Sequence, residues 1–401
     1  MSRHPFKASM SDAYNLVVLG GGCAGLSLSM ALARHGERCP RTLVIEPRTE
    51  YTNDRTWCYW HDRSAPDPLP AFHQWQTMRV AHAGQSVSLD CGMTPYHMLA
   101  AREFYATAQV SIDQQAAITL RQGVSVLGEP IRNGGVWEVR TSAGNVTALS
   151  VVDTRPPQLP RPGGAVLWQS FFGKEIECST AVFKPTSMDL MHFLAPDPRH
   201  IPFVYALPLT STRALVEVTV FGATPLGPRE LSAQLDAAIS ERVGNAAFTT
   251  LRSEHGILPM GLSEAPDPVH GSYVRVGVMA GGARPSTGYA FQRIQRWASE
   301  CADALVSCGH PVPHRPDPLA LRVMDPIFLE VLRADPIRGG ALFFSLFSRT
   351  DPARVIRFLS GHGGIVDSFA VVAAMPVLPF VRAALGLISR RSRTRDIEGT
   401  A

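Results

Sequence analysis

The stretch YNLVVLGGGCAGLSLSMALARHG, residues 14–36, constrains the fold of this chain more than any other segment. It predicts a strand, a glycine turn and a helix. Gly20, Gly22 and Gly25 have the G-x-G-x-x-G spacing. In that pattern the first glycine allows a tight turn, the second lets a pyrophosphate approach the backbone, and the third lets the helix pack on the strand. The helix would face the phosphates with its unpaired N–H groups, so the stretch predicts a Rossmann-type dinucleotide site.

A second strand supports this prediction. TLVIE, residues 42–46, ends in Glu46, an acid at the place where the Rossmann fold binds a ribose hydroxyl. NAD and FAD both use this arrangement, but two later segments favour FAD. SVVDTR (150–155) predicts a strand that returns to the sheet, and SYVRVGVMAGGARPSTGY (272–289) predicts another strand, a glycine loop and a new helix. A sheet begun near the N-terminus and completed far along the chain is typical of an FAD-containing fold with a substrate-binding insertion.

These patterns predict an α/β (α+β) fold with three parts. They are a Rossmann-type FAD-binding domain, an inserted mixed-sheet substrate domain and a helical C-terminal region. The FAD-binding domain would be discontinuous and comprise 12–60, 120–160 and 265–310. The substrate-binding domain would comprise 61–119 and 161–264, and the helical region 311–401.

Composition excludes several classes of partner. The 401 residues carry a net charge of +4 and contain no basic, aromatic-interleaved cluster, which argues against nucleic acid. The seven cysteines are scattered, without a C-x-x-C pair. We therefore expect a reducing, cytoplasmic compartment and neither a disulfide framework nor a zinc site. The 13 histidines show no ligand spacing, so we also expect no bound metal.

One late segment, FAVVAAMPVLPFVRAALGLI (369–388), is strongly apolar but is interrupted by Pro376, Pro379 and Arg382. It is too broken for a transmembrane helix. It predicts a pair of helices that either insert into a membrane surface or lie buried on the main domain.

The segment ALVEVTVFG (214–222) places one carboxylate, Glu217, in the middle of an apolar strand. The preceding FVYALPLTSTR (203–213) predicts a β-hairpin that turns near 210–212. Alternation along a strand leaves two possibilities for Glu217. It points to solvent, as the segment alone favours because unpaired buried acids are rare, or it is buried for chemistry.

Segments along almost the whole chain resemble the flavin-dependent lycopene cyclases of carotenoid synthesis, the β-cyclase group in particular. The most specific are MDPIFLEVLRADP (324–336) and FFSLFSRTDPARVIRFLSG (343–361), because of their length and unusual composition. The other matching segments are GGGCAG (20–25), DRTWCYW (54–60), PYHMLAAREFY (95–105), VVDTR (151–155), WQSFFG (168–173), YALPL with LVEVTVF (205–221), EHGILPMG (254–261) and GGARPSTGYAFQRIQ (281–295).

The resemblance implies roles for particular residues. The family's hairpin motif is usually Glu-Glu-Thr or Glu-Asp-Thr with a catalytic first acid, which corresponds to Glu217. The second acid is replaced by Val218, a change expected to remove a neighbour that tunes the pKa of Glu217. Arg55 would lie near the flavin, the alternative being a surface ion pair. The residues expected beside the flavin at a helix start are Gly281, Gly282, Ser286, Thr287 and Gly288.

The resemblance also implies an activity. Such an enzyme closes the linear ends of lycopene into β-ionone rings, giving γ-carotene or β-carotene, in an acid-catalysed reaction without net redox change. It would use bound reduced FAD, with NAD(P)H as reductant, and would act on lycopene or a related carotenoid at a membrane surface. The number and type of rings and the oligomeric state stay open. Candidates for cation–π stabilisation of the cationic intermediate are Trp57, Tyr59, Trp60, Phe171, Phe172 and Tyr289.

Two alternatives belong to other classes of protein. An FAD-dependent monooxygenase acting on a hydrophobic substrate would share the glycine pattern and the overall plan. A non-catalytic relative that binds flavin or a carotenoid would be consistent with the missing acid at Val218.

Overall fold

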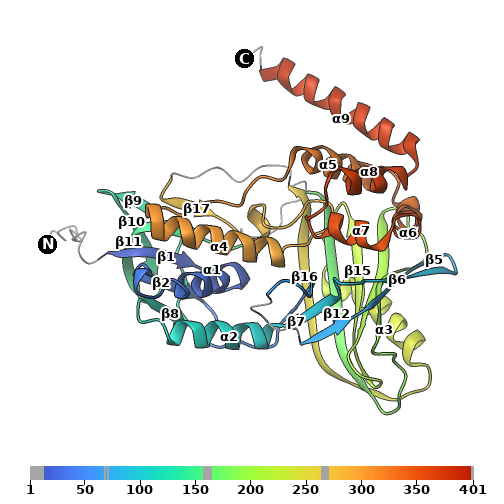
Figure 1. The fold of residues 1–401 in the computed structure, drawn as a ribbon, viewed down its shortest axis with the longest axis horizontal. Coiled ribbons are helices and arrows are strands. Elements are labelled where there is room, and N and C mark those ends of the chain that lie inside the picture. The colour runs from blue at the N-terminus through green and yellow to red at the C-terminus, as the bar shows by residue number, and fades with distance from the viewer. Residues whose placement is uncertain (1–12, 67–68, 70–71, 157–164, 263–270, 399–401) are drawn as a thin grey trace.

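The computed structural model describes residues 13–66, 69, 72–156, 165–262 and 271–398, and of residues 390–398 only the backbone. Two large sheets lie at opposite ends of the molecule, with helices between and above them (Figure 1). The segments 157–164 and 263–270, which include predicted domain boundaries, lie outside the described residues.

The first sheet has seven strands and contains the predicted Rossmann core. Its strands are β8 (Ile118–Gln122), β2 (Thr42–Glu46), β1 (Tyr14–Leu19), β11 (Gly144–Asp153), β10 (Val136–Thr141) and β9 (Ile131–Asn133) in spatial order, with β17 (Tyr273–Arg275) paired to β11. β8, β2, β1, β11 and β17 are parallel to one another, whereas β9 and β10 form an antiparallel edge. The strands predicted from TLVIE and SVVDTR are therefore confirmed.

Both faces of the first sheet are covered, which explains why β2 is buried along its whole length. One face packs against three helices: α1 (Cys23–Ala33), α2 (Ala101–Asp113) and α4 (Phe291–Cys308). The other face packs on the antiparallel strands through Trp137 and Val139. α2 falls in the range 61–119 that was assigned to the substrate domain. It lies instead beside α1, because Phe104, Ala108 and Ile112 bury their side chains in this layer.

A small third sheet joins the two ends of the molecule. Its strands are β3 (Thr56–Trp60), β7 (Tyr96–Ala100) and β4 (His73–Trp75), in the order β3-β7-β4. Tyr59 and Leu99 belong to the core of the first sheet, whereas Trp60 and Met98 belong to the core of the second. Alternation along these strands therefore ties one hydrophobic core to the other.

The second sheet is also seven-stranded and is mixed. Its strands are β16 (Phe248–Leu262), β12 (Ala165–Cys178), β15 (Arg213–Gly222), β14 (His200–Pro208), β13 (Ser187–Phe193), β5 (Thr77–His82) and β6 (Gln85–Asp90). All neighbours are antiparallel except β13 and β5. β14 and β15 form the predicted hairpin, and the Leu209 N–H closes its turn by donating to the Arg213 carbonyl over 2.8 Å.

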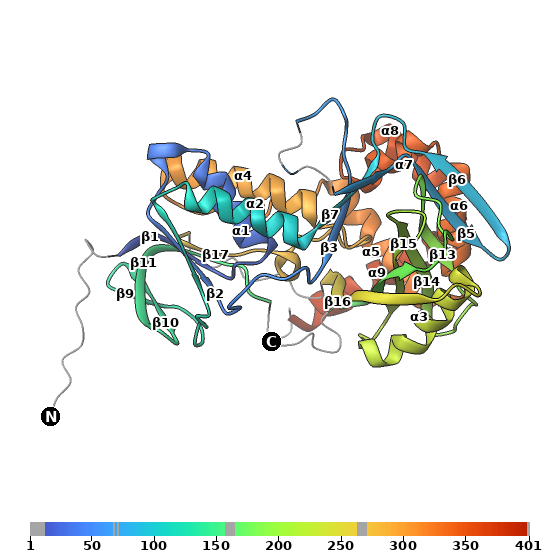
Figure 2. The ribbon, with the colours of Figure 1, turned by 90° about the horizontal axis from the view of Figure 1, so that it is seen from below.

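The C-terminal part is helical, as predicted. Its helices are α5 (Leu319–Ala334), α6 (Gly339–Arg349), α7 (Pro352–Leu359), α8 (Ile365–Ala373) and α9 (Val377–Glu398). Figure 2 shows α6, α7 and α8 on one side of the second sheet and α3 (Pro228–Val243) on the other. Within the described residues no single helix meets the length and hydropathy needed to cross a bilayer. One pair of helices, Ile365–Ala373 and Val377–Ser389, meets these two criteria when taken together, and the pair is bent by 113° at the break between them.

Candidate active site

The glycine loop between β1 and α1 has the geometry that its spacing predicts. Gly20 has φ +103°, a conformation that L side chains rarely adopt. A Cβ at Gly25 would overlap the Gly20 carbonyl oxygen, so only glycine lets α1 approach β1 this closely. Gly22 precedes α1, and no atom lies within 4 Å of where its Cβ would be. The loop therefore leaves open space in front of the N-terminus of α1, the end that favours anions.

Glu46 lies at the end of β2 beside this loop. Its carboxylate accepts hydrogen bonds from the Gly21 N–H (2.7 Å) and from Nε of Arg48 (2.7 Å). Tyr51 also reaches the loop, because its hydroxyl donates to the Gly21 carbonyl over 2.9 Å. The Glu46 carboxylate therefore holds the glycine loop in place. Both of its oxygens accept hydrogen bonds from protein groups in this structure.

The segment between β17 and α4 runs from the glycine loop to the centre of the molecule. A Cβ at Gly277 would lie 4.0 Å from Cβ of Ala24 in α1. The Gly277 N–H donates to Nε2 of His314 over 3.1 Å, and burial lowers the pKa of His314 to about 4, so the ring is neutral and can accept. Gly281 and Gly282 follow at the turn, whereas the later residues of the segment line a large cavity.

This cavity, of about 650 Å³, lies between the second sheet, β3 and the segment before α4. The sequence-predicted residues that line it are Arg55, Glu217, Ser286, Thr287 and Gly288. Its apolar wall consists of Phe171, Leu190, Met191, Phe203, Leu215, Phe221, Phe343, Leu346, Phe347 and Leu359. Three segments that the sequence placed far apart therefore meet around one apolar space, whereas Gly20, Gly22, Gly25, Glu46, Gly281 and Gly282 are not among its lining residues.

Glu217 lies in the middle of β15 and points into this cavity. Only 7% of the residue is exposed, so the solvent-facing interpretation is wrong. The Thr219 hydroxyl donates to Oε1 over 2.8 Å. Burial, followed by the negative charge of Glu254, raises the pKa of Glu217 to about 8, because both disfavour the carboxylate. Glu217 is therefore a carboxyl group that keeps its proton at neutral pH.

Val218 does not lie beside Glu217 in the cavity. Successive side chains on a strand point to opposite faces, and Val218 packs against Leu231 and Leu235 of α3. The expectation that an acid at this position would tune the pKa of Glu217 is wrong for this fold, since such an acid would face the apolar layer under α3.

A second buried acid that the sequence analysis did not single out lies across the sheet. Glu254 on β16 is 4% exposed and lines the same cavity. The Thr56 hydroxyl donates to its Oε2 over 2.8 Å, and Nη1 of Arg252 contacts the same oxygen. The EHGILPMG segment contained this acid, but the strand pairing that brings it near Glu217 runs through Gly173, which is 44 positions from Glu217 and 81 positions from Glu254. Local patterns do not reveal such a pairing.

Arg55 lines the mouth of the cavity and also forms an exposed ion pair. Its Nη2 lies 3.0 Å from Oδ2 of Asp54, and 56% of its side chain is exposed. A polar hollow of about 660 Å³ adjoins the cavity here and shares Arg55, Glu254 and His255 with it. Three further arginines line this hollow, namely Arg102, Arg213 and Arg252.

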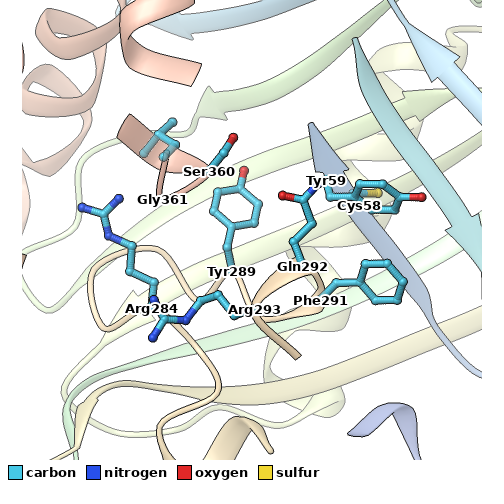
Figure 3. Close-up of a pocket in the computed structure, with 10 residues that line it drawn as sticks. Cys58, Tyr59, Arg284, Tyr289, Phe291, Gln292, Arg293, Ser360 and Gly361 are labelled. Atoms are coloured by element: carbon cyan, nitrogen blue, oxygen red, sulfur yellow. The ribbon is translucent and has the colours of Figure 1, made fainter. Parts of the chain in front are cut away.

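The segment before α4 is anchored to the C-terminal helices by a buried ion pair. Arg284 is 1% exposed, and its Nη2 lies 3.1 Å from Oδ1 of Asp325 in α5. Its guanidinium also donates to the carbonyl of Phe358. Figure 3 shows Arg284 and Tyr289 around a small adjoining pocket, with Ser360 and Gly361 on one side and Cys58 and Tyr59 on the other. Three of the segments that resemble the lycopene cyclases, 281–295, 324–336 and 343–361, are thus brought into contact.

Three features fit an FAD. The space at Gly22 admits a phosphate group, and the small residues Ser286, Thr287 and Gly288 line the cavity that the glycine segment reaches. Oε1 of Gln169, which also faces the cavity, is buried and has no hydrogen-bond partner in the described part of the chain. Such an acceptor is satisfied by an N–H group of a bound ring.

Of the six aromatic candidates, Trp57, Phe171 and Tyr289 line the cavity. Phe172 packs instead toward α3, on the other face of the sheet. Tyr59 and Trp60 are buried, and neither is among the residues that line the cavity. A stabilising role for aromatic faces is therefore restricted to three of the six.

Comparison with solved structures shows a shared fold. A geranylgeranyl bacteriochlorophyll reductase-like protein from Thermoplasma acidophilum is similar with a TM-score of 0.61 at 14% identity, over 94% of this chain and 99% of that one. A flavin-dependent brominase, Bmp2, gives 0.61 at 12% identity over 94% and 100%. p-Nitrophenol 4-monooxygenase from Pseudomonas putida gives 0.56 at 14% identity over 93% and 98%. The predicted fold class is therefore confirmed.

Comparison of sequences is more specific. A lycopene beta-cyclase from Pantoea ananas is 26% identical over 292 residues, which is 70% of this chain and 72% of the relative. The family model described as lycopene cyclase protein matches residues 15–385, which include the glycine loop, both buried acids and the helices up to the middle of α9. The chain therefore belongs to the lycopene cyclase family.

Proposed function

We propose that this protein is a lycopene beta-cyclase that closes the linear ends of lycopene, or of a related carotenoid, into β-ionone rings without net redox change. The observation that carries the proposal is Glu217, a buried carboxyl that keeps its proton at neutral pH and points into an apolar cavity of about 650 Å³. A general acid needs a pKa near the working pH, which burial provides here.

Ring closure begins with proton transfer from Glu217 to the terminal double bond of the hydrocarbon. Thr219 holds Oε1, so Oε2 is the oxygen that carries the acidic proton. The tertiary cation is attacked by the neighbouring double bond, which forms the ring carbon–carbon bond. A different proton then leaves the ring to the Glu217 carboxylate, which restores the acid. One proton is added and one is lost, so the product is an isomer of the substrate.

The cation needs electron density nearby and an environment without water. Trp57, Phe171 and Tyr289 line the cavity, and aromatic faces turned toward the cation would supply electron density through their quadrupoles. The apolar wall formed with α6 and α7 excludes water, which would otherwise capture the cation as an alcohol. When bound in its reduced form, FAD would supply a fixed negative charge to this site.

NAD(P)H is the proposed reductant of the flavin. The polar hollow that opens on the same cavity is lined by arginines and by the acids Asp54, Glu175 and Glu254. The exposed guanidinium groups of Arg55 and Arg102 are the ones that would contact the phosphates of a nicotinamide dinucleotide. Arg102→Ala removes a cation that is 67% exposed at its side chain. We expect it to raise the KM for NAD(P)H in anaerobic flavin reduction and to leave FAD content unchanged.

A hydrocarbon substrate resides in a bilayer, so we propose that α8 and α9 contact a membrane surface. The exposed apolar side chains of this pair are Ile365, Val366, Phe369, Val372, Val377, Leu378, Val381, Leu385 and Ile388. A second, apolar cavity of about 330 Å³ lies beneath them and shares Thr287, Phe343 and Leu346 with the main cavity. The two cavities are therefore adjacent, and movement of the shared side chains would open a route from the surface of α8 and α9 to Glu217.

The membrane proposal is tested with lipid vesicles. Replacing both Phe369 and Leu378 by Glu puts charges where apolar side chains would enter the bilayer, and we expect at least a tenfold loss of vesicle binding by flotation. Val110→Glu is the matched control, since Val110 is similarly exposed but lies on α2. Equal loss in both variants would contradict a docking surface at α8 and α9.

The activity is tested in bacteria engineered to accumulate lycopene. Wild type should yield pigments of unchanged mass and shorter-wavelength absorption, and Glu217→Gln should leave lycopene unconverted while retaining flavin. Glu177→Gln is the matched control, because Glu177 is a half-buried acid on the adjacent strand that does not line the cavity. Ring formation by Glu217→Gln would contradict the proposed role of the acid.

The same experiment separates the alternatives. A product heavier by oxygen, formed with consumption of NAD(P)H, indicates a monooxygenase such as the shared fold also permits. Untouched lycopene with retained flavin indicates a binding protein or another substrate. The support for a non-catalytic relative has weakened, because Val218 faces α3 and the cavity contains a second acid in Glu254.

A further inference from the structure

We propose that Glu254 is the second acid of this site, a positioning residue whose fixed negative charge keeps the neighbouring Glu217 carboxyl protonated. The inference rests on the proposed function and names how the acid of that site is tuned. It requires that the two carboxyl groups face each other, that Glu254 is the charged member of the pair, and that no other group performs the same role.

The register of the second sheet brings the two acids together. β12 lies between β15 and β16, and Gly173 is the partner of Glu217 on one side and of Glu254 on the other. Side chains in register point to the same face, and two strand spacings separate their backbones by about 10 Å, a gap that two glutamate side chains can close. Gly173 has no side chain to stand between them, and a Cβ there would lie 3.2 Å from Cβ of Glu217.

The surroundings of the two acids differ in a way that assigns the charge. Arg252 contacts Glu254 through Nη1 and donates to Thr56 through Nη2 over 2.9 Å, so a guanidinium and a hydroxyl together hold this carboxylate. Glu217 receives a hydrogen bond from the neutral Thr219 hydroxyl. Two buried carboxyl groups on one face of a sheet, two strands apart, disfavour ionisation of both, and the negative charge resides beside the arginine.

Burial raises the pKa of both acids. At Glu254, Arg252 and Thr56 oppose the rise, whereas at Glu217 the charge of Glu254 adds to it and has a larger effect than the opposing effect of either Thr219 or Arg252. The remaining titratable or charged groups that line the cavity or act on Glu217 are Arg55, Cys58, Tyr96, Tyr205, Arg252, His255 and Tyr289. Burial raises the pKa of the thiol and of the three phenols, so these groups stay neutral near pH 8. Glu254 is therefore the anion that acts on Glu217.

The test is the pH profile of ring closure. Glu254→Gln keeps the shape of the side chain and removes its charge, so Glu217 should lose its proton at lower pH. We expect the alkaline limb to move down by about one pH unit, with roughly a tenfold loss of rate above the limb and a smaller effect below it. Glu254→Asp keeps the charge and should leave the limb where it is in the wild type.

Two controls separate this role from a structural one. Glu175→Gln removes the other acid bound by Arg252, through Nε, and should lower stability without moving the limb. His255→Asn replaces the neighbour of Glu254 that also lines the cavity, and should likewise leave the limb in place. A limb that moves equally in either control would overturn the proposal.

A second readout does not require turnover. The infrared C=O stretch of the protonated carboxyl, identified by its loss in Glu217→Gln, should titrate with a lower midpoint in Glu254→Gln than in wild type. This measurement stands even where no carotenoid is converted, so failure of the proposed function and failure of this inference are distinguishable. An unchanged midpoint in Glu254→Gln would overturn the inference.

Discussion

The two seven-stranded sheets hold their functional residues in opposite ways. In the first sheet the glycine loop, the start of α1 and Glu46 come from one βαβ segment of 33 residues, Tyr14 to Glu46, and local backbone geometry fixes them. In the second sheet Glu217 and Glu254 belong to different strands and meet only through their shared register with Gly173. The comparison teaches that a cofactor loop is specified locally, whereas the acid site depends on the pairing of distant strands.

The largest expected effect belongs to the second sheet. Glu217→Gln removes the transferable proton and should reduce ring formation by about 10²–10⁴-fold, the usual contribution of a general acid. Flavin content should stay at the wild-type level, because the glycine loop lies at the other sheet. Measuring product and bound flavin in one preparation checks both expectations. Loss of flavin would show that the two sheets are not independent.

A pH titration of stability sharpens the same contrast. The folded-state pKa of Glu217 is raised from 4.5 to about 8, so its contribution to stability is fully present below pH 4.5 and is lost as pH rises toward 8. Relative to Glu217→Gln, wild type should therefore lose stability across this window, by at most about 5 kcal/mol. Urea unfolding of both proteins at pH 5 and pH 8 measures this, and a constant difference would contradict a buried, protonated acid.

The Arg284–Asp325 ion pair, which links the segment before α4 to the C-terminal helices, is tested at Asp325. Asp325→Asn leaves the buried guanidinium of Arg284 without its counter-charge, which should lower the free energy of unfolding by about 3–5 kcal/mol. Asp303→Asn is the control, since its side chain is 70% exposed and a change of at most about 0.5 kcal/mol is expected. Similar midpoints of urea denaturation for both variants would show that the Arg284–Asp325 ion pair contributes little to stability.

The smallest effects are expected at the glycine loop. Gly25→Ala places a Cβ against the Gly20 carbonyl and should cost about 1–3 kcal/mol of stability, with loss of flavin. Gly22→Ala enters open space, so it should leave thermal unfolding nearly unchanged and weaken only FAD binding. Equal thermal shifts in the two variants would contradict the separate roles assigned to these glycines.

The same contrast explains what could be predicted from the sequence. The glycine loop, the strand ending in Glu46 and the β14–β15 hairpin follow from local patterns, and the structure confirms these elements. The burial of Glu217 was left open because alternation gives two faces and does not say which one is covered. The resemblance to a family, rather than the segment itself, pointed to the buried face.

What could not be predicted depends on long-range pairing. Glu254 was overlooked because its nearness to Glu217 requires the pairing of β12 with both β15 and β16. The role expected for position 218 was wrong for a related reason, since the covering of the other face by α3 is not visible in the strand. The Arg284–Asp325 pair likewise joins segments 41 positions apart, and neither segment alone indicates its partner.

The central claim is that a protonated carboxyl at position 217 starts a redox-neutral ring closure. It is tested most directly by incubating the flavin-loaded, reduced protein with lycopene in D₂O and measuring product mass. The account predicts an isomer of lycopene that carries one deuterium for each ring formed, and no such product from Glu217→Gln. An oxygenated product, or labelled rings from Glu217→Gln, would contradict it.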